Sequence, residues 1–326
     1  MTDQARKVVI IGGGTGIYPV VRACKQLHLD ISTIVATSDS GGSTGRIRDE
    51  FGFPPVGDLR QSLAALAEDD GEEWIRKILL YRFDKGEGLA GHNLGNLLLT
   101  ALQDMTGSTT KALEIAGKVF RLEGNVIPVT EASVQLEITY QDGTKVIGEH
   151  TLDQHSAHPD TIVSVALVPD CTINPTAAAA LQSAESIIIG PGDLYASLLA
   201  VLVVPGMKQA LASSSAKLIY MMNLMTRSTQ TANMTAKNHC AAIESLIEKK
   251  LDQVIINTGA IPAEVLELYK NEHEYPVKDD LGDDPRTIRA NLIEETQYKQ
   301  TALDTAHRSV LRHNQEALET ILATVI

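Results

Sequence analysis

Five residues near the start of the chain, Gly12-Gly13-Gly14-Thr15-Gly16, carry the clearest chemical signal. They follow the apolar run Val8–Ile11 and precede Ile17–Val21, which predicts a buried strand, a tight turn and the start of a helix. Glycines leave backbone N–H groups accessible, and at a helix N-terminus those groups and the helix dipole both favour an anion. The turn therefore predicts a phosphate-binding loop, with a plain strand-to-helix connection as the alternative.

Two common nucleotide motifs do not fit this turn. The dinucleotide fingerprint needs a Gly or Ala three residues after its second glycine, and this sequence has Ile17 or Pro19 there. The Lys-Ser/Thr pair of a P-loop does not follow the glycines either. The sequence therefore disfavours an NAD-dependent dehydrogenase and a P-loop ATPase.

Three more apolar, strand-like runs end in polar or glycine-rich segments. These segments are Ser38–Gly45, Gly190–Tyr195 and Asn223–Thr226. In a parallel sheet the carboxyl ends of the strands share one edge, where ligands bind. The four segments are therefore predicted to line one cleft, in which the two glycine loops offer N–H groups to phosphate oxygens.

Charged side chains beside these loops have several candidate roles. Asp39 could meet a ribose hydroxyl, hold Mg²⁺ or cap its own loop. Arg46, Arg48 and Arg60 could clamp a diphosphate bidentately. Asp58, predicted at a helix N-cap, could cap or bind ligand, and His92 could donate a proton, bind phosphate or be structural.

Polar groups on the later loops complete the predicted site. Asn223 and Thr226 have the hydrogen-bonding groups to read a base or a sugar hydroxyl. The residues predicted to bind ligand are Gly12, Gly13, Gly14, Thr15, Gly16, Asp39, Ser40, Gly41, Gly42, Ser43, Arg46, Asp58, Arg60, His92, Asn93, Asn96, Gly190, Pro191, Gly192, Tyr195, Ser197, Asn223 and Thr226. Asp39 is the only metal candidate, and Mg²⁺ the only cofactor considered.

Strand-like and helix-like runs alternate along the 326 residues, which predicts an α/β fold with a mostly parallel sheet and helices on both faces. Asp142-Gly143 joins Val134–Tyr140 to Thr144–Glu149 and predicts a β-hairpin insertion. We expect one domain, 1–326, with a helical C-terminal segment 286–326. Its apolar stripe within Thr301–Thr324 faces either the core or a second subunit in a homodimer.

Composition limits the partners. The net charge is −13, which argues against nucleic acid and anionic lipid, although local arginines and N–H groups can still bind an anion. No apolar run reaches the roughly 18 residues that span a bilayer. The three cysteines are far apart and in no metal spacing, which indicates a reducing compartment. We therefore expect a cytoplasmic protein.

Six blocks together resemble a known family. In order and spacing, GGGTG, SDSGGSTGRIR, PPVGDLRQSLAAL, GHNLGNLLL, GPGDLYASLLAVLVVPG and YMMNLMTR are similar to the YvcK-like gluconeogenesis factor family, within the superfamily of 2-phospho-L-lactate transferase (CofD). The resemblance covers Val8 to Ala260 and implies a Rossmann-like three-layer α/β/α fold. Two departures stand out: Asp39-Ser40 replaces a pair of aspartates, and Arg227–Thr231 replaces Gln-x-Gly-Glu-Thr.

The resemblance implies two functions. The YvcK branch implies a cytoplasmic regulator that binds UDP-sugars such as UDP-N-acetylglucosamine, in carbon metabolism and cell-wall morphogenesis. The CofD branch implies Mg²⁺-dependent transfer of a phospholactyl group from a guanosine diphosphate donor. Asp39 without an adjacent acid favours the non-catalytic regulator, and a scaffold with vestigial loops is the third alternative.

Overall fold

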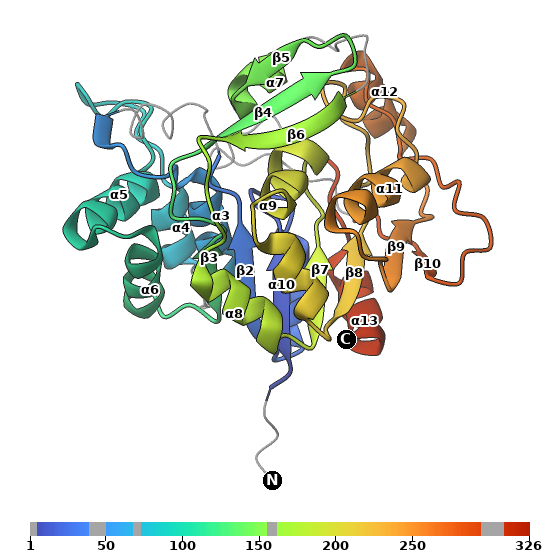
Figure 1. The fold of residues 1–326 in the computed structure, drawn as a ribbon, viewed down its shortest axis with the longest axis horizontal. Coiled ribbons are helices and arrows are strands. Elements are labelled where there is room, and N and C mark those ends of the chain that lie inside the picture. Colours follow the sequence, from blue (N-terminus) through green and yellow to red (C-terminus); the bar gives the residue numbers. More distant parts are fainter. Residues whose placement is uncertain (1–4, 39–49, 68–72, 155–161, 295–309) are drawn as a thin grey trace.

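A seven-stranded, wholly parallel sheet forms the centre of the computed structural model (Figure 1), which describes residues 5–38, 50–67, 73–154, 162–294 and 310–326. The strand order is β10-β9-β8-β7-β1-β2-β3. The strands are β1 (Lys7–Ile11), β2 (Asp30–Val35), β3 (Asn125–Pro128), β7 (Ser186–Ile189), β8 (Lys217–Met221), β9 (Gln253–Asn257) and β10 (Thr287–Ala290).

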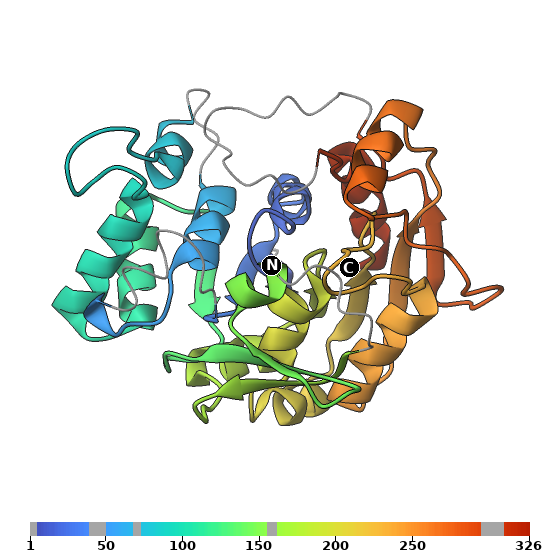
Figure 2. The same cartoon turned by 90° about the horizontal axis from the view of Figure 1, so that it is seen from above.

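Helices cover both faces of this sheet, as Figures 1 and 2 show. One face carries α1 (Tyr18–Gln26), α3 (Gly57–Leu66), α4 (Trp74–Leu80), α5 (Leu94–Thr106), α6 (Thr109–Val119), α12 (Ala263–Asn271) and α13 (Gln315–Val325). The other carries α8 (Pro175–Ser183), the π-helix η1 (Leu194–Leu199), α9 (Ala200–Leu202), α10 (Met207–Ser213) and α11 (Ala236–Ile247), while α7 (Glu149–Gln154) packs on strands β4 (Gln135–Tyr140) and β5 (Lys145–Ile147) of a smaller sheet. The three-layer α/β/α prediction is confirmed.

Strand β1 shows why its sequence is apolar without interruption. Val8 and Ile10 face one layer of helices, while Val9 and Ile11 face the other, and all four are at most 2% exposed. A strand buried on both faces needs apolar residues at every position. The same reason explains Ser186–Ile189, which is buried throughout.

A second sheet of three antiparallel strands, ordered β5-β4-β6, packs over the α8 to α11 face. Its strands are β4 (Gln135–Tyr140), β5 (Lys145–Ile147) and β6 (Ile162–Val168). The predicted hairpin at Asp142-Gly143 is confirmed. Strand β6 also pairs with β4, so the insertion is a three-stranded sheet and not only the predicted hairpin.

The C-terminal segment 286–326 is not helical throughout, which corrects the prediction. Its described part contains strand β10 and helix α13; neither β10 nor β3 was predicted from the sequence. The apolar stripe within 301–324 suggested one long helix, but helix α13 begins after Asn314, whose side chain caps it. Residues 310–314 are not helical, and 295–309 lie outside the described residues. Helix α13 packs against α1, so its stripe faces the core.

Among the described residues, no single helix is both long and apolar enough to cross a bilayer. The bent pair Leu194–Leu202 and Met207–Ser213 meets the length and composition criterion only when its two halves are combined. Residues Leu194–Leu202 are buried in the core of this fold.

The chain order reverses beside β1. From β1 the chain moves outward through β2 and β3, and later elements continue on the other side from β7 to β10. Open parallel sheets bind ligands at the carboxyl edge of such a switch point, where helices on opposite sides leave a crevice. The loops that follow β1 and β7 meet at this place.

Candidate functional site

The loop after β1 places open backbone N–H groups at the switch point. Gly12 donates its N–H to the Ile34 carbonyl over 3.1 Å, which ties the loop to β2. The N–H groups of residues 13–16 make no hydrogen bond to the part of the chain that the structure describes. Gly14 has a φ of +62°, a conformation that favours glycine. This arrangement fits the predicted phosphate-binding loop.

The loop after β7 packs directly against this first loop. A Cβ atom at Gly16 would lie 2.6 Å from the Pro191 carbonyl oxygen and 3.2 Å from the Gly192 Cα. Only glycine allows that approach. The predicted convergence of residues 12–16 with residues 190–195 at one sheet edge is therefore confirmed.

The second glycine loop uses its own N–H groups inside the protein. Gly190 donates to the Ile11 carbonyl over 2.8 Å. Gly192 donates to Asn223 Oδ1 over 3.4 Å, and Asn223 Nδ2 donates back to the Gly192 carbonyl over 2.8 Å. The expectation that Gly190 and Gly192 offer N–H groups to phosphate is corrected, because both already have protein partners. Asn223 thereby joins the β7 and β8 loops.

Gln230 caps the π-helix that follows the second loop. Its Oε1 accepts hydrogen bonds from the N–H groups of Tyr195, over 3.3 Å, and Ala196, over 3.2 Å. The N–H of Ser197 donates instead to the Asp193 carbonyl. Protein oxygens therefore accept the N–H groups of residues 195–197 in the first turn of η1. Gln230 escaped the sequence analysis because its partners lie more than 30 residues away.

Asp58 lies beside the open glycine loop. It is the second residue of α3, and Val56 occupies the N-cap, so the predicted N-cap position is corrected. A Cβ atom at Gly13 would lie 2.5 Å from Asp58 Oδ2, and one at Gly14 would lie 3.3 Å from Oδ1. The carboxylate therefore flanks the open N–H groups, where it can meet a hydroxyl, an N–H or a cation of a ligand.

Arg60 joins α3 to α5 in a buried network. Its Nε donates to Asn96 Oδ1 over 2.7 Å, and its Nη1 donates to the Leu79 carbonyl over 3.2 Å. Asn93 caps α5 by accepting the Asn96 N–H over 3.2 Å. These described contacts give Arg60, Asn93 and Asn96 a structural role, and their contact with a ligand stays a prediction. His92 is half-buried in the turn before this cap.

Thr226 pairs with a later segment of the chain. Its N–H donates to the Tyr275 carbonyl over 2.6 Å, and its Oγ1 accepts the Tyr275 N–H over 2.9 Å. Nearby, Arg227 Nη1 lies 3.3 Å from Glu274 Oε1. Burial raises the pKa of Glu274, and Arg227 opposes that rise.

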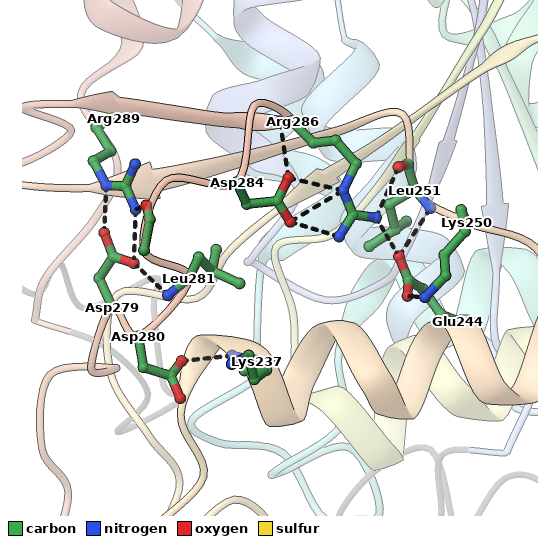
Figure 3. A network of polar contacts seen from close by, with 11 residues as sticks. Lys237, Glu244, Lys250, Leu251, Asp279, Asp280, Leu281, Asp284, Arg286 and Arg289 are labelled. Atoms are coloured by element: carbon green, nitrogen blue, oxygen red, sulfur yellow. Dashed lines mark hydrogen bonds and ion pairs between the residues drawn. The ribbon is translucent and has the colours of Figure 1, made fainter.

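A charged network holds this later segment in place (Figure 3). Arg289 binds Asp279 with bonds of 2.6 and 3.2 Å. Arg286 binds both Asp284 and Glu244, and its guanidinium lowers the pKa of Asp284 to about 2. The network thus fixes the chain that covers the loop after β8.

The loop after β2 is described only at its start. Thr37 and Ser38 are each 1% exposed, and their hydroxyls have no hydrogen-bond partner among the described residues. Asp39, Ser40, Gly41, Gly42, Ser43, Arg46 and Arg48 lie outside the described residues, so their predicted roles stay predictions. Within the described ranges no group of three or more His, Cys, Asp or Glu could hold a metal ion.

Comparison with known proteins agrees with this architecture. The model of the family "2-phospho-L-lactate transferase CofD" matches residues 8–297. The gluconeogenesis factor of Bacillus subtilis is 34% identical over 99% of both chains, and that of Halalkalibacterium halodurans is 36% identical over 84% of each. A crystal structure of a UPF0052-family protein from Bacillus halodurans superposes with a TM-score of 0.87 at 33% identity, covering 98% of this chain and 99% of that one.

Proposed function

This chain belongs to the 2-phospho-L-lactate transferase CofD family, and from that premise we propose that it binds a nucleotide-sugar, specifically a UDP-sugar such as UDP-N-acetylglucosamine. We propose that binding serves regulation of carbon metabolism, consistent with the name gluconeogenesis factor that its relatives carry, and of cell-wall morphogenesis. The protein would act where nucleotide-sugars are made, in the cytoplasm.

One observation carries this proposal: the open N–H groups of residues 13–16 lie at the switch point of the sheet. Adjacent N–H groups at the start of α1 suit the oxygens of a diphosphate. Asp58 beside them suits a sugar or ribose hydroxyl. A diphosphate flanked by hydroxyl-bearing groups is the chemistry of a nucleotide-sugar.

Binding without turnover fits the groups that organise the site. Asn223 and Gln230 are carboxamides, which orient partners by hydrogen bonds and do not transfer protons at neutral pH. The family name favours a second candidate, a transferase that moves a phospholactyl-type group from a nucleoside diphosphate donor. The two candidates differ in whether the diphosphate bond survives.

Titration calorimetry tests binding with UDP-N-acetylglucosamine, UDP-glucose, GDP, NAD and ATP, each with and without Mg²⁺. We expect saturable binding of the UDP-sugars, and equal or tighter binding of NAD or ATP would contradict the proposal. Phosphorus NMR of UDP-N-acetylglucosamine with the protein and Mg²⁺, followed for hours, tests turnover. Loss of the diphosphate signals beyond one equivalent would favour the transferase.

A further inference from the structure

Several buried polar atoms near the carboxyl edge of the sheet have no hydrogen-bond partner among the described residues. Among the described residues these include the hydroxyls of Thr37 and Ser38 after β2, the hydroxyl of Thr229 and the Nε2 of Gln230 after β8. A buried donor that lacks a hydrogen bond costs free energy, so such atoms are uncommon unless a ligand or water completes them. Their position at the edge that carries the glycine loop points to a ligand.

Gln230 has the best-defined geometry of these residues. It is 6% exposed, and its Oε1 accepts two backbone N–H groups from the first turn of η1. Two N–H donors require the oxygen on that side, so the amide orientation is fixed by chemistry. The Nε2 group is therefore directed away from η1, and its two N–H donors have no partner among the described residues.

The place of Gln230 links it to the ligand site. The turn of η1 that it caps follows residues 190–193, which pack against Gly16 and are joined to β8 by Asn223. Gln230 is thus bonded to the element that starts directly after the loop packed against Gly16.

We propose that Gln230 is a specificity-determining residue whose Nε2 donates a hydrogen bond to an acceptor oxygen of the bound nucleotide-sugar. This inference rests on the proposed function. The acceptor lies either on the UDP part or on the sugar. A buried donor selects for a ligand with an acceptor at that place, because a ligand without one leaves the donor unpaired.

Gln230→Glu separates the two functions of the side chain. The carboxylate can still accept the N–H groups of Tyr195 and Ala196, but it cannot donate. Gln103→Glu is the matched control, because Gln103 is also buried and its Nε2 donates to the Pro54 carbonyl and to Thr109 Oγ1. The control loses two bonds inside the protein, whereas Gln230→Glu loses none.

Calorimetry with UDP, UDP-N-acetylglucosamine and UDP-glucose, together with thermal melting, tests the proposal. We expect Gln230→Glu to bind at least tenfold more weakly than wild type, with a melting temperature within about 2 °C of it. Gln103→Glu should melt several degrees lower. Weaker binding of all three probes would place the acceptor on the UDP part, and weaker binding of the UDP-sugars alone would place it on the sugar.

Unchanged affinity in Gln230→Glu would overturn the proposal and leave the residue as a helix cap, with UDP-sugar binding intact. If Gln230→Glu melts as low as Gln103→Glu or fails to fold, the cost of burying its carboxylate accounts for this, and the side-chain amide signals of wild-type protein then decide. If wild type bound none of the probes, the proposed function would fail first. In wild-type protein the Gln230 side-chain amide signals should shift on addition of UDP-N-acetylglucosamine, and unshifted signals would contradict the proposal.

Discussion

The two glycine loops of this protein have similar sequences and different hydrogen bonding. After β1, the N–H groups of residues 13–16 have no hydrogen-bond partner in the part of the chain that the structure describes. After β7, the N–H groups of Gly190 and Gly192 are bound by the strand beside them and by Asn223. Glycine is needed in the first loop for close approach of a ligand and of the second loop. In the second loop it is needed for packing, so glycine content alone does not identify a phosphate site.

Separating the two loops should have the largest effect. Gly16→Ala puts a Cβ 2.6 Å from the Pro191 carbonyl oxygen, a backbone atom that cannot rotate away. We expect the free energy of unfolding to fall by about 1–3 kcal/mol, as for other overpacking substitutions. UDP-N-acetylglucosamine affinity should fall about a hundredfold, which is about 2.7 kcal/mol.

Gly117→Ala in α6 is the control for Gly16→Ala, because nothing lies within 4 Å of its Cβ position. It should raise stability slightly, since alanine is the better helix former. Chemical denaturation and calorimetry measure both variants. Normal binding by Gly16→Ala would show that the loops need not touch for the site to form.

The fold was largely predictable because its central strands are buried on both faces and therefore read as apolar runs. The two strands that were not predicted, β3 and β10, have four residues each and form the two edges of the sheet. In β10, Arg289 also interrupts the apolar pattern. The apolar stripe of the C-terminal segment extends to residues before Asn314, but the capping bond of Asn314 marks the start of helix α13. Short-range hydrogen bonding decided this boundary, and hydrophobic periodicity does not report it.

The meeting of the loops after β1 and β7 at one sheet edge was predictable, but the hydrogen bonds that hold the loops were not. Strand ends and glycines identified the sheet edge, because both signals are local in sequence. The pairing of Asn223 with Gly192 spans 31 residues, and that of Gln230 with Ala196 spans 34. Such contacts depend on how the elements pack, and a single sequence does not encode them in a readable spacing.

Acidification should destabilise the fold through a buried histidine beside the loop after β8. His313 is buried, donates from Nε2 to the Met222 carbonyl and lies next to the β8 loop. Burial lowers the pKa of His313 to about 4, from 6.5 in an exposed histidine. Between these values the unfolded chain binds a proton that the folded chain does not, so stability falls as pH falls through this range. The loss should reach about 2 kcal/mol near pH 4.5.

His239 should contribute similarly, because burial lowers its pKa to about 4 as well. His313→Gln keeps a donor for the Met222 carbonyl and removes the titration, so its stability should depend less on pH between 6.5 and 4.5. Urea unfolding across this range measures the slope. Equal slopes for wild type and His313→Gln would show that other groups carry the pH dependence.

Asn223→Ala tests whether ligand binding needs the hydrogen bonds that join the loop after β7 to the loop after β8. It removes both hydrogen bonds to Gly192 and should cost about 1–2 kcal/mol of stability. Asn257→Ala is the control, because Asn257 also bonds the N–H and the carbonyl of a glycine, Gly259, and in addition accepts the Leu292 N–H. We expect both variants to be destabilised, but only Asn223→Ala to bind UDP-N-acetylglucosamine more weakly. Tighter binding of inorganic diphosphate by Asn223→Ala would instead show that the freed Gly192 N–H is a latent phosphate donor.

Asp58→Asn should have the smallest effect and gives the finest distinction. The Asp58 carboxylate lies beside the open N–H groups of Gly13 and Gly14, so it repels a phosphate bound there. Without Mg²⁺, removing this charge should tighten diphosphate binding about threefold to tenfold, a gain of about 0.7–1.4 kcal/mol.

If Asp58 holds a ligand hydroxyl, UDP-N-acetylglucosamine should not share that gain. If it holds Mg²⁺ for a transferase, the variant should lose the effect of Mg²⁺ on binding. Calorimetry of both probes with and without Mg²⁺ separates these cases, and an unchanged affinity in all four titrations would place Asp58 outside the site.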